Sequence, residues 1–297
     1  MRSFDELFAA ADQLRTPVPV VAAGGADSTV IQALELARRR GWVRPMLSGD
    51  PRKIAEMAAG MDIDIAPFEI IEDEPDSAMQ AVRCVHEGRA QLLMKGQIPT
   101  PSLMKAVLQR EGGLRTGKTI CQVVLMEIPR DRRTFLMSDT GVTIAPTPQQ
   151  HGEILEAVIH VARRLGCPTP RIALMAATEK PVEAMPETLA QVELTARAEA
   201  GEFGPCSVQG PLSFDLAYTE VAGARKGIQG DVTGAADGMV FPSLLAANLT
   251  VKGIMYTANC RFGGILMGTS KPVVFMSRAD NVETRLHSLA YALHTLS

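Results

Sequence analysis

Aromatic residues are scarce in this chain of 297 residues, at 4% with one Trp and three Tyr. Platforms that stack single-stranded bases need several aromatic side chains, so the composition disfavours such a role. An excess of charge of one sign is also missing, because 30 Lys and Arg stand against 33 Asp and Glu. The net charge of −3 gives no electrostatic footprint for duplex nucleic acid or an acidic membrane surface.

Cysteine pairs and long apolar runs are missing as well. The five cysteines are widely spaced and form no CxxC pair, which disfavours a disulfide framework or a zinc knuckle and favours a reducing compartment. No run of 18 apolar residues occurs, and the first 14 residues have early acids and no apolar core of signal length. We therefore expect a cytoplasmic protein without membrane spans.

Apolar residues make up 46% of the chain, which is enough for a large core. Short apolar runs alternate with longer helical patterns, and this alternation predicts an α/β fold with a mostly parallel sheet covered on both faces. The runs predict strands at 18–23, 43–47, 91–94, 120–127, 134–137, 172–175, 239–241, 265–267 and 273–276, with 120–127 and 134–137 paired as a hairpin. The helical patterns cover 31–40, 52–60, 77–87, 149–165, 186–200, 212–222, 244–256 and 281–295.

The segment 112–119, GGLRTGKT, fits the phosphate-binding pattern GxxxxGK[ST]. That pattern works when a strand leads into the loop and a helix leaves it, because the loop and helix N–H groups then face the phosphates. Here the preceding SLMKAVLQRE is helical and the following TICQVVLMEI is strand-like. We interpret the glycines as a glycine-rich helix C-cap instead.

Other short motifs of metal and cofactor sites do not occur. The five histidines form no HExxH, and none has a Cys at ligand spacing. There is no GxSxG, and no GxGxxG follows the first strand. We therefore expect neither a metal ion nor a dinucleotide.

Four segments place polar residues where predicted strands end, which is the edge of parallel sheets that binds ligands. A Ser-Arg pair beside a helix N-terminus is a reasonable anion site. Taken alone, each segment is also explained by an ordinary cap or surface ion pair. The segments are MKG at 94–96 with Thr100 and Lys105, SDTG at 138–141, GPLSFD at 210–215, and KPVVFMSR at 271–278.

Together these segments resemble the phosphate acetyl/butyryl transferase family, in the family's order, from about residue 91 to the C-terminus. The pattern SRADxxET is closer to the butyryl branch. The similar blocks are MKGQIPT with LMKAVL and GGLRTGK, SDTGVTIAPT, GPCSVQGPLSFDLAY, ADGMVFPSLLAANLTVK and KPVVFMSRADNVETR.

The resemblance implies transfer of a short acyl group between coenzyme A and inorganic phosphate, with no metal or redox cofactor. It implies a two-domain fold like that of isocitrate and isopropylmalate dehydrogenases, with mostly parallel sheets and an interdomain cleft. The expected domains are 1–138 with 276–297, and 139–275. The second would carry the contact of a homodimer or higher homo-oligomer.

The family motifs also imply site residues. Ser277, Arg278, Asp280 and Glu283 would be catalytic. Acetyl-type enzymes have an Asp seven residues after the motif Ser, where this chain has Thr284. The preferred general base is therefore Asp280, then Glu283, then Asp215. The substrate-binding residues would be Lys95, Gly96, Thr100, Asp139, Gly210, Pro211, Asp215, Asn248 and Lys252.

Two other functions stay open from the sequence. One is a hydroxyacid dehydrogenase on the same fold that uses a metal ion and NAD, although the clustered Asp ligands it needs are not evident. The other is a non-catalytic protein that binds an acyl-CoA or acyl phosphate, which the Thr at 284 allows. The acyl chain length and the physiological direction are equally open.

Overall fold

A computed structural model describes residues 1–72, 76–277 and 279–296 of the chain. The chain divides into two compact units. The first unit comprises residues 4–118 and 262–297, and the second comprises 1–3 and 119–261. Arg278, which the sequence assigns to catalysis, lies outside the described residues.

In the first unit, the strands run in the order β3, β2, β1, β4, β11, β10. Neighbours are parallel except β10 and β11. Ala23 is opposite Lys95, and Val274 is opposite Met94, so three strands reach the same edge together. The bounds are β1 Val18–Ala23, β2 Val43–Ser48, β3 Glu69–Ile71, β4 Leu92–Lys95, β10 Arg261–Met267 and β11 Val273–Val274.

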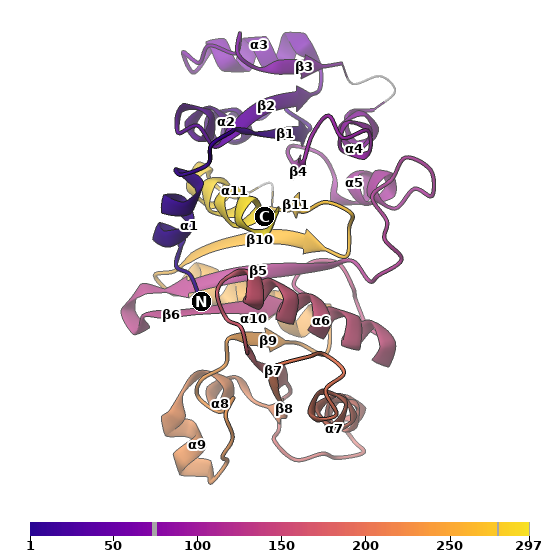
Figure 1. The fold of residues 1–297 in the computed structure, drawn as a ribbon, viewed down its shortest axis with the longest axis vertical. Coiled ribbons are helices and arrows are strands. Elements are labelled where there is room, and N and C mark those ends of the chain that lie inside the picture. The colour runs from indigo at the N-terminus through magenta and orange to yellow at the C-terminus, as the bar shows by residue number, and fades with distance from the viewer. Residues whose placement is uncertain (73–75, 278, 297) are drawn as a thin grey trace. The chain divides into compact units, whose positions relative to one another are not determined.

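Helices cover both faces of this sheet. Helices α1, α2 and α11 pack together on one side, and α4 and α5 lie on the other (Figure 1). Asp27 caps α2 by accepting a hydrogen bond from the Val30 N–H, as the sequence allows. The bounds are α1 Phe4–Ala11, α2 Ser28–Arg39, α3 Pro51–Ala59, α4 Ser77–His86, α5 Thr100–Val107 and α11 Val282–Leu296.

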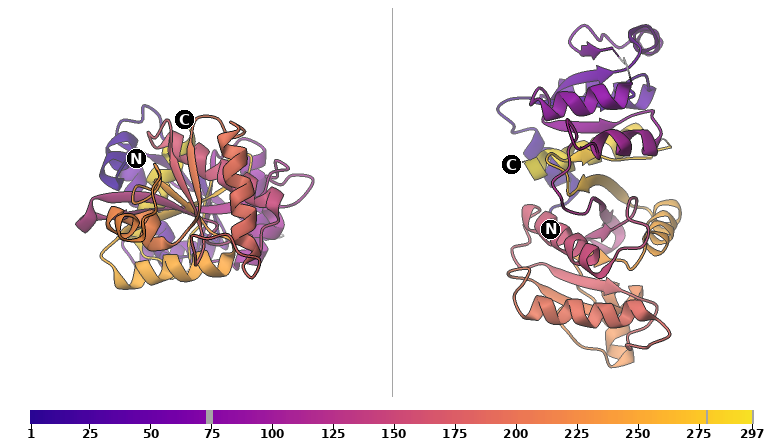
Figure 2. Two further views of the ribbon diagram at one scale, coloured as in Figure 1. Left: turned by 90° about the horizontal axis from the view of Figure 1, so that it is seen from below. Right: turned by 90° about the vertical axis from the view of Figure 1, so that its right-hand side faces the viewer.

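In the second unit, the strand order is β5, β6, β9, β7, β8. β5 and β6 form an antiparallel hairpin, and the other neighbours are parallel. Helices α6 and α10 lie on opposite faces of this sheet (Figure 2). The bounds are β5 Cys121–Ile128, β6 Arg133–Ser138, β7 Arg171–Met175, β8 Ser207–Leu212, β9 Gly238–Val240, the 3₁₀ turn η1 Pro129–Asp131, α6 Pro148–Arg164, α7 Pro186–Glu199, α8 Phe214–Tyr218, α9 Glu220–Lys226 and α10 Leu244–Thr257.

The predicted α/β class, the mostly parallel pairing and the hairpin are confirmed. The predicted helix 212–222 is wrong at its start and its middle. Leu212 ends β8, and Thr219 is in an extended conformation that separates α8 from α9. α1 and β3 were not predicted, and β8 was anticipated only as a strand that ends at the GPLSFD segment.

The order around segment 112–119 is helix, loop, strand, as the sequence indicated. The glycine C-cap is wrong, however, because α5 ends at Val107 and its C-cap residue is Leu108. Gly112 follows four residues later with φ +75°, a conformation that favours glycine. The loop then folds back, and the Leu114 N–H donates to the carbonyl of Val107.

The compact units have boundaries different from those expected at 138/139 and 275/276. Residues 119–138 belong to the second unit because β6 pairs with β9. Residues 262–275 belong to the first unit because β11 pairs with β4. The last helix, α11, returns to the first unit, as expected. No helix in the described part of the chain combines the length and apolarity needed to span a membrane.

Candidate active site

The carboxyl ends of β1, β4 and β11 bring three loops together in the first unit. Gly96 lies where two of these loops touch. Its N–H donates to the carbonyl of Ala23 at 2.8 Å, and a Cβ atom there would lie 2.2 Å from the carbonyl oxygen of Gly24. Only glycine fits this close approach. The structure therefore gives Gly96 a backbone role.

Lys95 is the last residue of β4 and is 2% exposed. Its Nζ lies 3.4 Å from the carbonyl oxygen of Gly96. A cation held at a strand end beside a tight turn is well placed to offset developing negative charge. Thr100, by contrast, is exposed at the first position of α5.

The turn before α11 is organised by Ser277 and Asp280. The backbone N–H of Ser277 donates to Asp280 Oδ2 at 2.7 Å, and the Asp280 N–H donates to the Ser277 carbonyl at 3.2 Å. Asn281 caps α11, since its Oδ1 accepts the Thr284 N–H at 2.9 Å. The Ser277 side chain is exposed, and its Oγ accepts only a long 3.3 Å bond from the Ala279 N–H among the contacts of the described residues.

The three base candidates have different surroundings. The Asp280 carboxylate is closest to Ser277 through the bond just described. The Glu283 side chain is 71% exposed, and its Oε1 lies 3.9 Å from Nε2 of His287. Asp215 belongs to the other unit. Thr284, at the position of the acetyl-type Asp, is 6% exposed. Asp280 is the acid that this turn holds beside Ser277.

Arg285 is a residue of this edge that sequence reasoning missed. It is fully buried on α11 and donates to Thr29 Oγ1 and to the carbonyl oxygen of Lys95. Burial lowers the pKa of its guanidinium, although the charges of Asp27 and Asp280 oppose this. The sequence could have indicated Arg285, because it stands four residues before Leu289 and so on the same face of the predicted last helix as this apolar residue.

In the second unit, the loop after β6 is built around the carboxylate of Asp139. Asp139 is 3% exposed. Burial raises the pKa of Asp139, although four backbone N–H groups that donate to the carboxylate oppose the shift. Asn248 of α10 joins this loop, since its Nδ2 donates to the Thr140 carbonyl at 3.0 Å. The donors are the N–H groups of Gln122, Gly141, Val142 and Thr143, at 2.9, 2.9, 3.1 and 2.6 Å.

The GPLSFD segment lies elsewhere in the second unit. A Cβ atom at Gly210 would lie 2.5 Å from the Cβ of Leu174, so this glycine lets β8 pack against β7. The Gly210–Pro211 peptide bond is cis. Three strand spacings of about 4.8 Å separate β8 from β6, so this segment begins about 14 Å from the Asp139 loop. The structure does not bring these two segments together.

Asp215 is an exposed residue in the first turn of α8. It accepts a hydrogen bond from Ser213 Oγ at 2.5 Å and lies 3.1 Å from Nζ of Lys226. These two contacts lower the pKa of Asp215. A carboxylate with a lowered pKa and a surface ion pair is a weak proton acceptor. Lys252 is exposed on α10.

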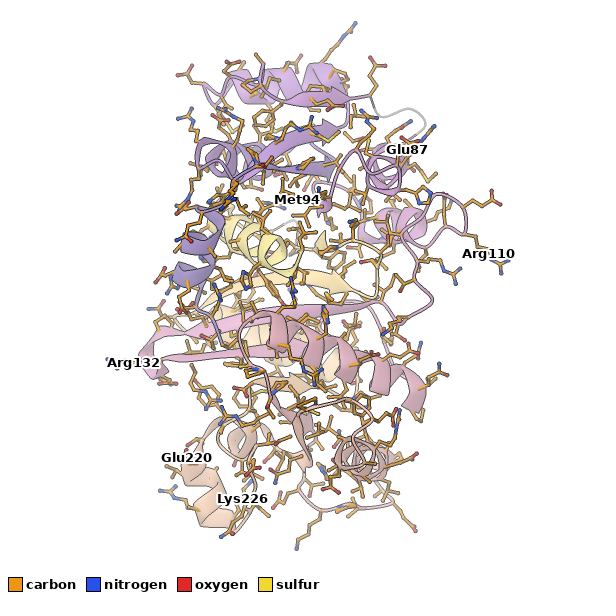
Figure 3. The ribbon with its side chains drawn as sticks, in the orientation of Figure 1. Glu87, Met94, Arg110, Arg132, Glu220 and Lys226 are labelled. Carbon is orange, nitrogen blue, oxygen red and sulfur yellow. The ribbon has the colours of Figure 1, made fainter. Side chains whose placement is uncertain are left out.

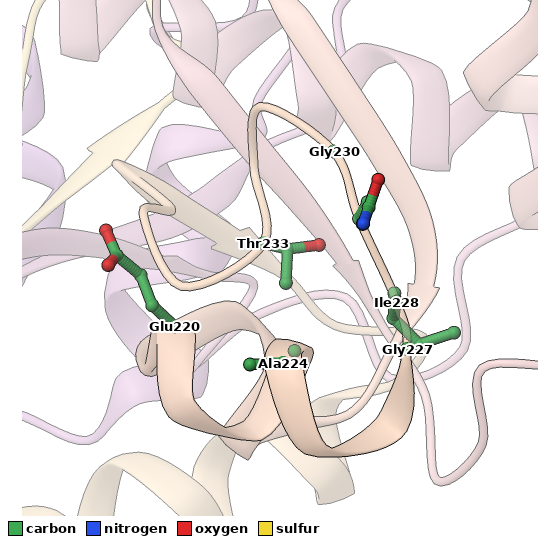
Figure 4. Close-up of a pocket in the computed structure, with 8 residues that line it drawn as sticks. Glu220, Ala224, Gly227, Ile228, Gly230 and Thr233 are labelled. Carbon is green, nitrogen blue, oxygen red and sulfur yellow. The ribbon is translucent and has the colours of Figure 1, made fainter.

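Two surface pockets lie away from these loops. One of about 360 Å³ is lined by α9 and the glycine-rich loop after it, including Glu220, Gly227 and Thr233 (Figure 4). Another, of about 320 Å³, lies between α4 and the loop after α5, and its lining includes Gln109, Glu111 and Glu87, which Figure 3 labels. None of the site residues expected from the sequence lines either pocket.

Comparison with known proteins decides the family. Residues 74–293 match the family model of phosphate acetyl/butyryl transferases. The chain belongs to this family. It is 35% identical over 276 residues to a phosphate butyryltransferase of Clostridium acetobutylicum, covering 92% of this chain and 91% of the relative. It is 36% identical over 265 residues to a phosphate acetyltransferase of Thermotoga maritima, covering 89% and 90%.

A solved family member has the same fold. The structure of a branched-chain phosphotransacylase from Enterococcus faecalis superposes with a TM-score of 0.81 at 31% identity, covering 94% of this chain and 99% of that one. The chain is thus a phosphate acyltransferase, as its sequence motifs indicated. All of the site residues expected from the sequence fall within the matched residues 74–293. Among the described residues, no group of three His, Cys, Asp or Glu side chains is arranged to hold a metal ion.

Proposed function

We propose that this phosphate acyltransferase moves a short acyl group, between acetyl and butyryl in length, from coenzyme A to inorganic phosphate and back. The observation that carries the proposal is the convergence of two motif segments at one sheet edge. Register places the end of β4, with Lys95, beside the end of β11, which leads to Ser277. An edge with a cation, a hydroxyl and a helix N-terminus suits an anionic substrate.

In this reaction a phosphate oxygen attacks the thioester carbonyl carbon, the new C–O bond forms, and the C–S bond breaks with both electrons on sulfur. Lys95 and Arg278 offset the negative charge of phosphate and of the tetrahedral intermediate. The Ser277 hydroxyl donates a hydrogen bond to the leaving thiolate. In the reverse direction Asp280 takes the proton from the thiol of coenzyme A as it attacks. Holding both substrates at one place supplies much of the rate.

The remaining site residues form the second part of the proposal. We propose the isocitrate dehydrogenase-like arrangement that the sequence resemblance implies, in which residues of both units serve one active site. Asp139 and Asn248 then act by holding the loop after β6, and Gly210, Pro211, Asp215, Thr100, Glu283 and Lys252 keep their expected substrate or catalytic roles as predictions. The reaction proposed needs no metal or redox cofactor, and its expected place is the cytoplasm.

We also propose that the chain forms a homodimer through the second unit. Support comes from α10, where Leu245, Leu249 and Tyr256 are 69%, 64% and 79% exposed. Their spacing of four and seven residues puts them on one face of the helix. Ile144 is 74% exposed, and its carbonyl accepts the N–H of Leu244 at the start of α10. A neighbouring apolar stripe of this kind is typical of a protein interface.

The deciding assay is release of free thiol from acetyl-, propionyl- and butyryl-CoA, with and without phosphate, in a buffer that contains a chelator. Phosphate-dependent release establishes the transfer and ranks the acyl chains. Arg278→Ala should lower kcat/KM for phosphate about 100-fold, the loss typical of a removed charge-stabilising donor. Ser277→Ala should lower kcat, whereas the exposed control Ser270→Ala should not. No release from any of the three thioesters contradicts the proposal.

A further inference from the structure

Arg285 makes contacts that join the two parts of the candidate site in the first unit. Its Nε donates to Thr29 Oγ1 at 2.7 Å, and its Nη1 donates to the carbonyl oxygen of Lys95 at 3.2 Å. Nη2 lies 3.9 Å from Asp27 Oδ1 and makes no hydrogen bond with the described residues. The side chain is fully buried. One guanidinium therefore connects α11 to the loop after β1 and to the end of β4.

The Thr29 hydroxyl extends this connection. It accepts from Arg285 and donates to Asp27 Oδ1 at 2.6 Å, and the same carboxylate oxygen caps α2 through the Val30 N–H. A planar guanidinium with several fixed donors can hold two acceptors at a set separation, which an ammonium on a flexible stem cannot. The arrangement thus fixes the start of α2 relative to the end of β4.

The carbonyl that Arg285 binds belongs to the peptide that links Lys95 to Gly96. The orientation of this peptide sets the direction in which the chain leaves β4. It therefore also sets the position of the Lys95 Cα, from which the side chain extends. Arg285 is also one turn into α11, and its own N–H donates to the carbonyl of Asn281, directly after the Ser277–Asp280 turn. The same residue therefore relates the lysine to the serine turn.

Burying the charge of Arg285 costs free energy, so the need to fill space in the core does not explain why an arginine stands at this position. Desolvating a guanidinium is expensive, and replacing buried ionic groups by apolar ones is often neutral or stabilising in other proteins. The core-facing positions of α11 beside Arg285 are either apolar, as at Leu289, or polar and uncharged, as at Thr284 and Ser288. A methionine of similar length fits such a helix face at less electrostatic cost.

We propose that Arg285 is a positioning residue of the transferase, which holds the Lys95–Gly96 turn in register with the Ser277 turn. The proposal rests on the function proposed above. Displacing catalytic groups by about 1 Å can cost about 100-fold in rate even when the change lies away from the chemistry. The expected signature is a fall in kcat with little change in KM, because substrate contacts remain while their alignment for the transition state is lost.

The test uses Arg285→Met, Arg285→Lys and Thr29→Val. We expect kcat to fall at least tenfold in Arg285→Met and about fivefold in Thr29→Val. In both variants KM for acyl-CoA should stay within about threefold of the wild-type value. Arg285→Lys should resemble Arg285→Met, because the lysine cannot hold both acceptors. The matched control is Glu35→Gln, which disrupts another buried charge of the same unit, paired with Arg38 and Arg39. It should lower the Tm and leave kcat within about twofold.

Hydrogen exchange gives a readout that needs no turnover. The amides of Gly96 and Gln97 donate to the carbonyls of Ala23 and Gly24. In Thr29→Val and Arg285→Lys these two amides should exchange at least tenfold faster than in the wild type, and in Glu35→Gln at the wild-type rate. Wild-type kcat in folded Arg285→Met overturns the proposal, as does unchanged exchange at Gly96. If the wild type lacks transferase activity, the proposed function fails, and exchange alone decides the positioning role.

Discussion

At the scale of single residues, two acids that the sequence singles out, Asp139 and Asp280, make different kinds of contact. The Asp139 carboxylate accepts hydrogen bonds from four backbone N–H groups, one in β5 and three in the loop after β6. Such a group is a scaffold, because a proton transfer there would break the bonds that shape the loop. The Asp280 carboxylate accepts the backbone N–H of Ser277 at Oδ2, in the turn before α11. A carboxylate held beside an exposed serine lies where a general base for a thiol bound at that serine would have to lie.

Asp280→Asn separates the structural duty of this residue from the chemical one. The amide oxygen of Asn still accepts the Ser277 N–H, so the turn should persist and the Tm should stay near that of the wild type. The proton acceptor is lost, and kcat for the direction that starts from coenzyme A should fall about 100-fold. The comparison is the initial rate with acyl phosphate and coenzyme A across pH 6–9.

The loss should be greatest on the acidic side of that profile, where less of the thiol ionises by itself. Glu283→Gln, on the exposed side of the same helix start, tests the second base candidate and should retain the wild-type profile if Asp280 is the base. An unchanged rate in Asp280→Asn would transfer the assignment to Glu283 or Asp215.

At the scale of elements, the tip of the β5–β6 hairpin is tied to α8. The Tyr218 hydroxyl donates to Asp131 Oδ2 at 2.6 Å, and the Arg133 guanidinium lies over the Tyr218 ring, 4.9 Å from its centroid. The ion pair with Arg130, and then the Tyr218 bond, hold the pKa of Asp131 well below its usual range. Burial, followed by the bond to Asp131, raises the pKa of Tyr218 to about 12.

These shifts predict how stability changes in acid. Because the folded pKa of Asp131 lies below that of the unfolded chain, 3.8, its contribution is present above pH 4 and is lost as the pH falls below this value. Asp131→Asn should therefore have a lower Tm than the wild type at pH 7, and the difference should shrink towards pH 2. Thermal unfolding at each pH measures this, with Asp64→Asn as control.

Asp64 is an exposed loop residue that accepts one backbone bond, from the Ala66 N–H, and Asn can keep that bond. The Tm of Asp64→Asn should therefore fall with decreasing pH in the same way as the Tm of the wild type. A constant Tm difference between Asp131→Asn and the wild type from pH 7 to pH 2 would mean that the ionised form of the Asp131 carboxylate does not stabilise the fold more than its protonated form.

The elements that the sequence predicted best are those whose signal is local. β1 is a continuous apolar run, VPVVAA, and its observed bounds equal the predicted ones. β3 is three residues long and only half-buried, so its composition carries no clear pattern. The sequence predicted one helix over 212–222 that runs past Thr219. The structure has two helices there, because Thr219 is extended and separates α8 from α9. Apolar periodicity does not reveal a break at a single residue.

The same distinction applies to the site. Lys95 and Ser277 could be predicted as site residues because each stands at the end of a strand-like run, and strand ends meet at one edge of a parallel sheet. Arg285 was not found, because its partner Thr29 is 256 residues away in the sequence. A contact of that range exists only after folding. Asp139 was predicted as a site residue, but its hold on the loop depends on four N–H groups, from β5 and the loop after β6, that only folding brings together.

At the scale of the whole molecule, the exposed apolar face of α10 has a consequence for assembly. Lys252 falls on the same stripe, three residues after Leu249 and four before Tyr256. A solitary monomer would leave this face in water at a cost of about 25 cal/mol for each Å² of apolar surface. A second copy that covers the stripe removes this cost, and a lysine at its rim keeps the ammonium in water.

If the proposed dimer forms through this stripe, Leu249→Glu should convert it to a monomer, because two carboxylates would be buried at or near the symmetry axis. The molar mass from light scattering after gel filtration should halve from about twice 31.9 kDa. Leu36→Glu is the matched control, since Leu36 is 44% exposed on α2 and should leave the mass unchanged. Lys252→Ala should keep the mass and raise KM for acyl-CoA if its substrate role holds. A wild-type mass of one chain would contradict the dimer, and an unchanged mass in Leu249→Glu would place the interface elsewhere.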